Sequence, residues 1–401
     1  MTIRHLYPAV EPSLNLDFAN SKKLDSRITF TRASTGTYID ESGIIRTAAA
    51  NEARFDHDGD GNSLGLLIEE SRTNYFTNSS NPTWTTLNSG TGTLPTITAV
   101  SDAAPDGTTN SVQRFQFDRG AGNTAANFSL ASYIATVASD FYSNTLWMKS
   151  NDANSYTIQM YDANGGIGNE FVVTPTWQRF SIDGSTTFKN SNHTATTAPM
   201  IVFGLRNQPD YNSYPVGNTN SQTADILAWG PQIEAGSFPT SYIPTSGSTV
   251  TRSADVASMT GTNFSSWYNN NEGSLFFTQK TSTSPTQSTY YYLINSGSTV
   301  NGYRLARQVI PVDISGANAW SSTASWLDLY PESTFQNMAF AYTDGSAATA
   351  KNGAILETNT EALADVSPTL LRIAYNVTST ISRLTYYPVR LPDATLRALT
   401  L

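Results

Sequence analysis

Residues 145–182, TLWMKSNDANSYTIQMYDANGGIGNEFVVTPTWQRFSI, decide the fold class of this chain. The run contains three strand-like segments, Thr145–Lys149, Tyr156–Tyr161 and Trp177–Ile182, with no helical periodicity between them. The connecting loops are rich in Asn, Gly, Ser and Thr, which favour turns. Similar segments lie on both sides, at Val112–Phe117, Met200–Leu205 and Ala224–Trp229. Short strands at this spacing predict an antiparallel β-sandwich.

The composition of the whole chain also favours an all-β protein. Its 401 residues include 18 Phe, 20 Tyr and 7 Trp, and only 14% are charged, against roughly a quarter in a typical globular chain. The length predicts two to three domains. The net charge is −9 and no run of three basic residues occurs, so neither nucleic acid nor an anionic membrane is an expected partner.

The chain has no cysteine, which excludes disulfides, thiolate metal sites and cysteine nucleophiles. Its start has no apolar stretch long enough for a signal peptide, and no apolar run is long enough to span a membrane. We therefore expect a soluble protein made in a cytoplasm.

Patterns along the chain predict two antiparallel β-sandwiches preceded by an N-terminal segment of β-hairpins. The expected parts are residues 1–80 (hairpin segment), 81–238 (first sandwich), 239–260 (linker) and 261–401 (second sandwich). The hairpins have no obvious core of their own, so they should lie against something else. The linker follows from the Pro, Gly, Ser and Thr cluster of Gly236–Thr251. A short C-terminal helix should open at Pro392 and Asp393.

Signatures of catalysis are absent or stand in the wrong context, so we expect no enzymatic activity. Gly61–Gly65 matches GxSxG, but a strand rather than a helix is expected after it. Gly120–Ala125 fits GxGxxA, but no βαβ unit is predicted. Asp328 and Glu332 are near each other but flank Pro331, and no ExDxxE string of a sandwich glucanase occurs. These two acids are the residues to test for a glycosidase.

Asp56, Asp58 and Asp60 form, with Gly61, the string DxDxDG. Alternate carboxylates on a tight turn can converge on one hard cation such as Ca²⁺. The twelfth position of the loop is Leu67 rather than Glu, which excludes an EF-hand. Two interpretations stay open: a solvated hairpin turn, or a Ca²⁺ site formed by the three aspartates. No other cofactor is expected.

Aromatic side chains are the remaining candidates for ligand binding, because the apolar faces of sugars stack on Trp and Tyr. Trp147, Trp177 and Trp229 lie within strand segments and are expected in the core. Other tryptophans lie near loops or strand ends of the second sandwich. Our ligand-binding candidates there, in a shallow groove, are Trp267, Trp320 and Trp326.

Several longer sequence strings identify a protein family more specifically than the composition does. They are FTRASTGTYIDESGII (Phe30–Ile45), ARFDHD (Ala53–Asp58), GLLIEESRTN (Gly65–Asn74), AWGPQIEAGSFPTSYIPTSGSTVTRSAD (Ala228–Asp255) and RLTYYPVRLPDATLRALTL (Arg383–Leu401). Together they resemble bacteriophage virion fibre proteins of the head-fibre or tail-fibre type. The resemblance implies that the first sandwich is a jelly roll like those of carbohydrate-binding modules. It also implies that the second is a concanavalin-A-like lectin domain.

The resemblance further implies a structural protein of the phage, a fibre or adhesin displayed on the virion that recognises host-surface glycan. Its expected partners are other virion proteins of the head, neck or tail, and host-surface polysaccharide. We expect a homotrimer, located in the virion after assembly in the host cytoplasm. The alternatives are a capsid or neck decoration protein without a ligand, and a polysaccharide depolymerase.

Overall fold

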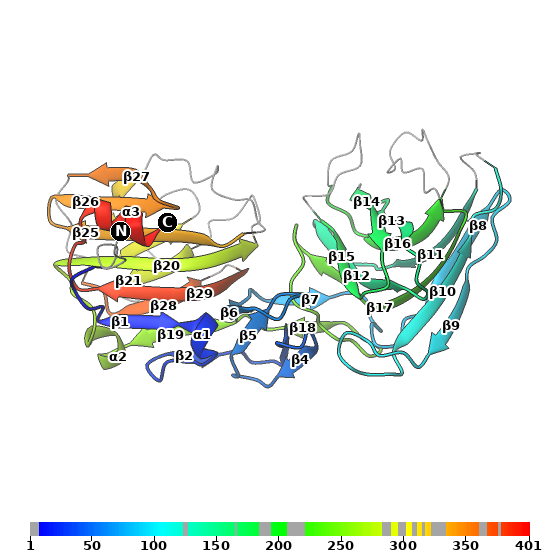
Figure 1. Ribbon diagram of the computed structural model, residues 1–401, viewed down its shortest axis with the longest axis horizontal. Coiled ribbons are helices and arrows are strands. Elements are labelled where there is room, and N and C mark those ends of the chain that lie inside the picture. The colour runs from blue at the N-terminus through cyan, green and yellow to red at the C-terminus, as the bar shows by residue number, and fades with distance from the viewer. Residues whose placement is uncertain are drawn as a thin grey trace. The chain divides into compact units, whose positions relative to one another are not determined.

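The computed structural model describes residues 8–122, 127–164, 167–183, 194–206, 221–282, 290–295, 302–306, 311–314, 317–321, 334–360, 367–375 and 378–401. Strands dominate these residues (Figure 1). The helices in them are short: α1 (Phe18–Ser21), α2 (Thr262–Ser265) and α3 (Asp393–Leu399). The predicted all-β class is therefore confirmed, and α3 begins where the sequence indicated.

Contacts between residues divide the chain into two compact units. Unit 1 comprises residues 1–43, 47–71 and 253–401, and unit 2 comprises residues 44–46 and 72–252. Unit 2 is thus inserted between two parts of unit 1 along the sequence.

Unit 2 is a sandwich of two antiparallel sheets. The first has the order β15-β12-β17-β10-β9, with β7 joined to β17 and β18 joined to β7, and the second has the order β14-β13-β16-β11-β8. Phe115 and Ile226 of the first sheet share one core with Met160 and Phe203 of the second. The strands are β7 (Arg72–Asn74), β8 (Thr85–Ser89), β9 (Thr96–Val100), β10 (Val112–Asp118), β11 (Phe128–Ile134), β12 (Tyr142–Ser150), β13 (Tyr156–Asp162), β14 (Ile167–Val173), β15 (Gln178–Ile182), β16 (Met200–Arg206), β17 (Thr223–Ala235) and β18 (Val250–Arg252).

Unit 1 is a second antiparallel sandwich. One sheet has the order β27-β26-β25-β20-β29-β6-β5, with β1 also on β29, and the other has the order β2-β19-β28-β21-β22-β23-β24. The strands are β1 (Leu14–Asp17), β2 (Thr29–Thr31), β5 (Arg54–His57), β6 (Ser63–Ile68), β19 (Val256–Thr260), β20 (Glu272–Ser282), β21 (Tyr290–Asn295), β22 (Gly302–Ala306), β23 (Pro311–Ile314), β24 (Ala317–Ser321), β25 (Gln336–Thr343), β26 (Ser346–Lys351), β27 (Ala354–Asn359), β28 (Leu370–Tyr375) and β29 (Thr378–Tyr387).

Alternation along β20 shows how unit 1 buries both faces of its larger sheet. Leu275 and Phe277 enter the core between the two sheets. Phe276 points to the opposite face, where it packs with Leu391 and Leu396 around α3. The helix lies against β25 and β26 (Figure 1). Successive side chains of a strand point to opposite faces, so a continuous apolar run at this point requires cover on both sides.

The N-terminal strands are integral to unit 1, which differs from the expected sequence of four consecutive parts. β1 pairs with β29 from Leu14 opposite Tyr386, and β6 pairs with the same strand from Leu66 opposite Ile381. β2 pairs with β19. Part of the expected linker is also strand, since it contains all of β18 and β19. The apolar alternation of the N-terminal strands is buried by these long-range pairings.

Candidate functional site

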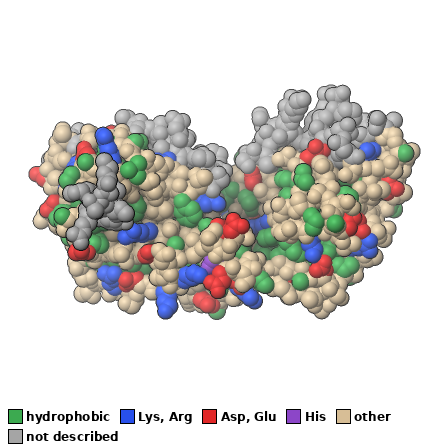
Figure 2. Space-filling model, in the orientation of Figure 1, with side chains coloured by type: hydrophobic (Ala, Val, Ile, Leu, Met, Phe, Trp, Pro, Cys, Tyr) green, Lys and Arg blue, Asp and Glu red, His purple; other side chains and the backbone are tan. Residues whose placement is uncertain are grey.

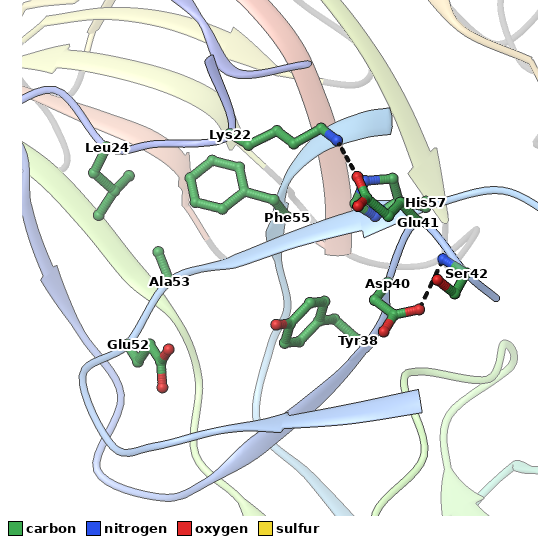
Figure 3. Close-up of a pocket in the computed structure, with 10 residues that line it drawn as sticks. All are labelled: Lys22, Leu24, Tyr38, Asp40, Glu41, Ser42, Glu52, Ala53, Phe55 and His57. Atoms are coloured by element: carbon green, nitrogen blue, oxygen red, sulfur yellow. Dashed lines mark hydrogen bonds and ion pairs between the residues drawn. The ribbon is translucent and has the colours of Figure 1, made fainter. Parts of the chain in front are cut away.

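A hollow of about 590 Å³ opens in the N-terminal part of unit 1 (Figure 3). It lies among Lys22 at the end of α1, strand β3 (Gly36–Ile39) with the turn that follows it, and β5. None of the described lining residues belongs to β4 (Ile45–Ala48), the hairpin partner of β3. Aromatic, apolar and charged side chains face one space, as in many sites for small polar ligands. The lining residues are Lys22, Leu24, Tyr38, Asp40, Glu41, Ser42, Glu52, Ala53, Phe55 and His57.

Side chains of β5 hold the backbone of β3 where no strand ladder joins the two. Arg54 Nη1 donates to the carbonyl oxygen of Thr37 at 2.8 Å. Asp56 Oδ1 accepts the N–H of Ile39 at 2.7 Å, and His57 Nδ1 lies 3.0 Å from the carbonyl oxygen of the same residue. Tyr38, between these anchored residues, directs its ring into the hollow (Figure 3). The position of the ring is therefore set by three side chains of β5.

A β-bulge lies at the two β5 residues that contact Ile39. The register between β5 and β6 shifts at Asp56 and His57, which oppose Gly65 and Ser63, so that Leu64 is the extra residue. A bulge adds local twist and redirects side chains. The bulge lies opposite the two consecutive β5 residues whose side chains both reach Ile39.

His57 is the buried polar group of the hollow. The side chain is 6% exposed, and its Nε2 has no hydrogen-bond partner among the described residues. Nδ1 faces a carbonyl oxygen, which only accepts, so Nδ1 carries the hydrogen. In the neutral ring Nε2 is then an acceptor with an unused lone pair.

The charged residues around the hollow are mostly acidic. Lys22 Nζ and Glu41 Oε2 form an ion pair of 2.9 Å across its rim. The hydrogen bond and charge of the ammonium lower the pKa of Glu41. Asp40 accepts the N–H of Ser42 at 2.9 Å, and Glu52 accepts the N–H of Ala49 at 2.7 Å. Three carboxylates against one ammonium give the lining a negative balance.

Asp56 is half-buried in β5, between the lining residues Phe55 and His57. Burial raises its pKa to about 6, and the hydrogen bond from Ile39 N–H offsets only part of this rise. The charge of Glu69 raises the pKa further, whereas that of Arg54 lowers it. This carboxyl group is a structural anchor that titrates in mildly acidic solution.

The three aspartates predicted as a Ca²⁺ site do not gather around one point. Asp56 points to Ile39, whereas Asp58 closes its own turn by accepting from the N–H groups of Asp60 and Asn62. Asn62 Nδ2 also donates to Asp58, at 3.0 Å. No group of three metal-ligating side chains occurs among the described residues. The geometry corrects the Ca²⁺ interpretation in favour of a hairpin turn, because the carboxylates are used separately.

This turn has a packing role at the hollow. Gly61 has φ +81°, and a Cβ at this position would lie 2.6 Å from the carbonyl oxygen of Glu41. The turn therefore lies directly against the backbone that carries one of the rim residues. Only glycine permits both this conformation and this approach.

Of the tryptophans predicted to bind ligand, Trp267 belongs to the core. It is 3% exposed, packs edge-on against Phe264 and Tyr386, and donates its Nε1–H to the carbonyl oxygen of Asn263. It cannot stack on a sugar without unfolding its surroundings, so this expectation is corrected. Trp320 is in β24, but its side chain lies outside the described residues, as does Trp326. Asp328 and Glu332 also lie outside them.

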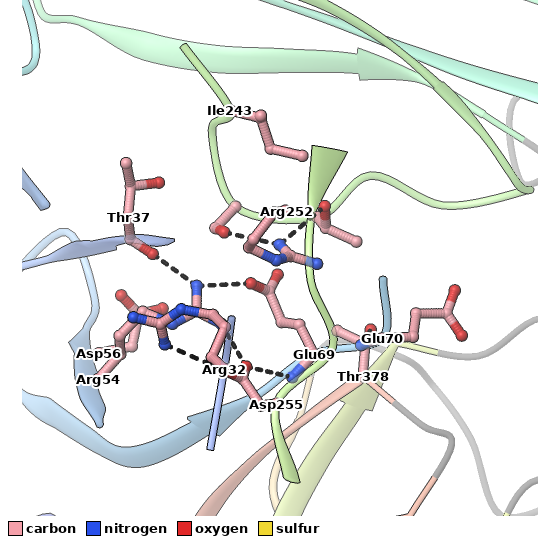
Figure 4. Close-up of polar contacts among 12 residues, drawn as sticks. Arg32, Thr37, Arg54, Asp56, Glu69, Glu70, Ile243, Arg252, Asp255 and Thr378 are labelled. Atoms are coloured by element: carbon pink, nitrogen blue, oxygen red, sulfur yellow. Dashed lines mark hydrogen bonds and ion pairs between the residues drawn. The ribbon is translucent and has the colours of Figure 1, made fainter. Parts of the chain in front are cut away.

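Several of the long sequence strings each contribute a charged residue to one buried ion cluster in unit 1 (Figure 4). Asp255 binds Arg32 Nη1 at 3.0 Å and also binds Arg54 Nη2. Arg54 Nη1 reaches Glu69 Oε2 at 2.7 Å, and the N–H of Glu69 donates to Asp255 at 2.8 Å. All four side chains are at most 2% exposed. The cluster ties the N-terminal strands to the segment that precedes β19.

The sequence interpretation missed both the ion cluster and the hollow. The available signals were charged residues next to large apolar ones, such as Arg54 before Phe55 and Glu69 after Ile68. Charged side chains are almost never fully buried unless they are paired. Their placement therefore indicated partners, although it could not indicate which ones.

Unit 2 has a hollow of its own, of about 410 Å³, between β9, β10, β13 and β17. Its polar groups are largely satisfied within the unit. Asp225 accepts from Arg114 Nε at 2.8 Å, and Tyr156 donates its hydroxyl to Asp152 at 2.7 Å. Leu94, 53% exposed, also lines it. It offers a ligand fewer unused groups than the hollow around His57.

The surface of the described residues has no large basic area on the face drawn in Figure 2, where Lys and Arg side chains are interspersed with Asp and Glu. Within the described part of the chain, no helix has both the length and the apolar character needed to cross a membrane.

Comparisons with known proteins give distant likenesses only. No family model and no curated protein matches the sequence. A carbohydrate-binding module, CBM40 of the Ruminococcus gnavus IT-sialidase bound to α2,3-sialyllactose, is 15% identical, with a TM-score of 0.29 over 35% of this chain and 88% of that chain. Trypanosoma rangeli sialidase is 10% identical, with a TM-score of 0.28 over 98% and 99% of the two chains. The CBM22 tandem of Paenibacillus barcinonensis Xyn10C is 8% identical, with a TM-score of 0.25 over 80% and 97%. Likenesses this distant assign no residue and no ligand, and the resemblance to virion fibre proteins rests on the sequence strings.

Proposed function

We propose that this chain is a non-enzymatic adhesin displayed on a bacteriophage virion, and that it binds host-surface glycan in the hollow around Tyr38, Phe55 and His57. The observation that carries the binding role is this hollow of about 590 Å³, in which two rings, a buried imidazole and several carboxylates face one space. Rings offer faces for sugar stacking, and the polar groups can bind hydroxyls. The virion assignment is supported by the long sequence strings.

The proposed assembly is a homotrimer whose copies bind together to a dense glycan surface. A single open site of this kind binds weakly, and many copies on one particle raise the overall avidity. Virion proteins of the head, neck or tail would hold the chain on the particle.

The test is glycan binding by the intact chain and by ring-deleted variants. Host polysaccharide and a dense glycan array should retain the protein, and Tyr38→Ala and Phe55→Ala should each weaken retention about tenfold. Phe141→Ala, which removes a ring that is 43% exposed in unit 2, is the matched control. If both ring variants are retained as well as the parent, the glycan binds at a site other than this hollow. Absence of retention on any host glycan would favour a decoration protein, and hydrolysis of the polysaccharide would favour a depolymerase. Antibody labelling of the particle tests the virion location.

A further inference from the structure

Given the glycan binding proposed above, we infer that the hollow selects sugars without a carboxylate, and that His57 Nε2 accepts a hydrogen bond from one of their hydroxyl groups. The first line of support is charge. Asp40, Glu41 and Glu52 line the hollow, and Lys22 is the ammonium that faces them. A sialic or uronic acid would place another carboxylate among these, and juxtaposed like charges are strongly unfavourable.

The second line of support is the imidazole. Its Nδ1 is committed to Ile39, so the ring cannot turn without breaking that contact. Its Nε2 is buried and has no partner among the described residues. A buried acceptor without a donor is costly, and a sugar hydroxyl is a donor of suitable size. An uncharged sugar can therefore satisfy Nε2 without adding negative charge.

Exposed side chains near His57 give a ligand a way toward Nε2. Glu41 and His57 are near neighbours, and Figure 3 shows the Glu41 carboxylate beside the imidazole. Its partner Lys22 is 41% exposed and Glu41 itself is 70% exposed. Exposed ion pairs of this kind contribute little to stability. A ligand can displace this pair, and the turn that carries Gly61 lies against the backbone of Glu41.

The experiment compares neutral and carboxylated probes on one dense array. The neutral probes are glucose, galactose, mannose and N-acetylglucosamine, and the carboxylated probes are α2,3-sialyllactose and glucuronic acid. The intact chain should bind at least one neutral probe and bind the carboxylated probes roughly tenfold more weakly or not at all. The double variant Asp40→Asn, Glu52→Gln keeps both backbone hydrogen bonds and should reduce this discrimination several-fold.

His57→Asn tests the imidazole separately, because the amide of Asn can take the place of Nδ1 but offers nothing at Nε2. Affinity for the preferred neutral probe should fall about fivefold, with circular dichroism unchanged. Among deoxy versions of that probe, one should bind the intact chain more weakly than the probe itself does. The same deoxy sugar and the probe should bind the His57→Asn variant with equal affinity. If carboxylated probes bind as tightly as neutral ones, charge selection is refuted while glycan binding stands. If the His57→Asn variant binds every probe with the same affinity as the intact chain, the role of Nε2 is refuted. If no probe binds, the proposed function and this inference fail together.

Discussion

His57 Nδ1 lies 3.0 Å from the carbonyl oxygen of Ile39, and this single contact sets both the orientation and the tautomer of the imidazole. The same contact supplies a donor to a strand that has no ladder to β5. The side chain therefore links the stability of the β3 segment to the chemistry of the hollow.

Removing this donor should destabilise unit 1. His57→Phe keeps a ring but leaves the Ile39 carbonyl without its donor, so we expect a loss of about 1–3 kcal/mol in the free energy of unfolding. His57→Asn, which can still donate, should remain within about 1 kcal/mol of the parent. Urea denaturation measures both, and equal stability of the two variants would contradict the role of the contact.

Asp56 should make stability depend on pH. Its pKa is raised from 3.8 to about 6 in the folded state, so between these values the folded chain holds a proton that the unfolded chain has released. Stability is therefore highest below about pH 4 for this group and falls as the pH rises through 6. Asp56→Asn should remove this fall and be more stable than the parent at pH 7, because its amide oxygen still accepts from Ile39.

The measurement is the difference in melting temperature between parent and Asp56→Asn across pH 4 to 7, which cancels other titrating groups. Asp58→Asn is the matched control, since hydrogen bonds from Asn62 lower the pKa of Asp58. Because the Asp58 carboxyl group is ionised in both the folded and the unfolded chain over most of this range, the difference between parent and Asp58→Asn should change little with pH. A constant difference between parent and Asp56→Asn would show that the carboxyl group does not titrate in this range.

The buried ion cluster should be sensitive to loss of its central acid. Asp255→Asn leaves the guanidinium groups of Arg32 and Arg54 with less compensating charge, and we expect a loss of about 3–5 kcal/mol. Asp25→Asn breaks the partly exposed pair with Arg27 in the same unit and should cost less than about 1 kcal/mol. Calorimetry of both variants checks the comparison, and similar losses would mean that burial of the cluster contributes nothing.

Gly61 and Gly43 offer a matched pair of substitutions. Both have positive φ, +81° and +74°, but a Cβ at Gly61 would lie 2.6 Å from Glu41 O, whereas nothing lies within 4 Å at Gly43. Gly43→Ala should cost about 1 kcal/mol from conformation alone. Gly61→Ala adds the steric conflict, so it should cost clearly more and also weaken glycan retention. Equal melting temperatures of the Gly61→Ala and Gly43→Ala variants would show that the turn moves to accommodate the added Cβ without cost.

The sequence was sufficient to predict elements whose signal is local. The strand-like segments Val112–Phe117 and Tyr156–Tyr161 predicted β10 and β13, and Pro392 with Asp393 predicted α3. These patterns depend on neighbouring residues, which the sequence lists directly. The all-β class followed from them.

Long-range pairing and burial were not accessible in the same way. Nothing in the string around Leu14 names Tyr386 as its partner, and nothing near Asp255 names Arg54. Trp267 stands near a strand end, a position that suits either core or surface, and only tertiary packing decides between them. The hollow likewise could not be predicted, because it depends on hydrogen bonds from side chains of β5 to the backbone of β3.

The pairing of β29 with both β1 and β6 has a consequence for biosynthesis. The residues of unit 2 leave the ribosome before β29 does, so this inserted unit can complete its sandwich while β1 still lacks its partner and β6 has only β5 beside it. Those early strands carry apolar side chains and unpaired edges, the features that favour aggregation of nascent chains. Maturation of unit 1, and with it the hollow, therefore waits for the late strand to be translated.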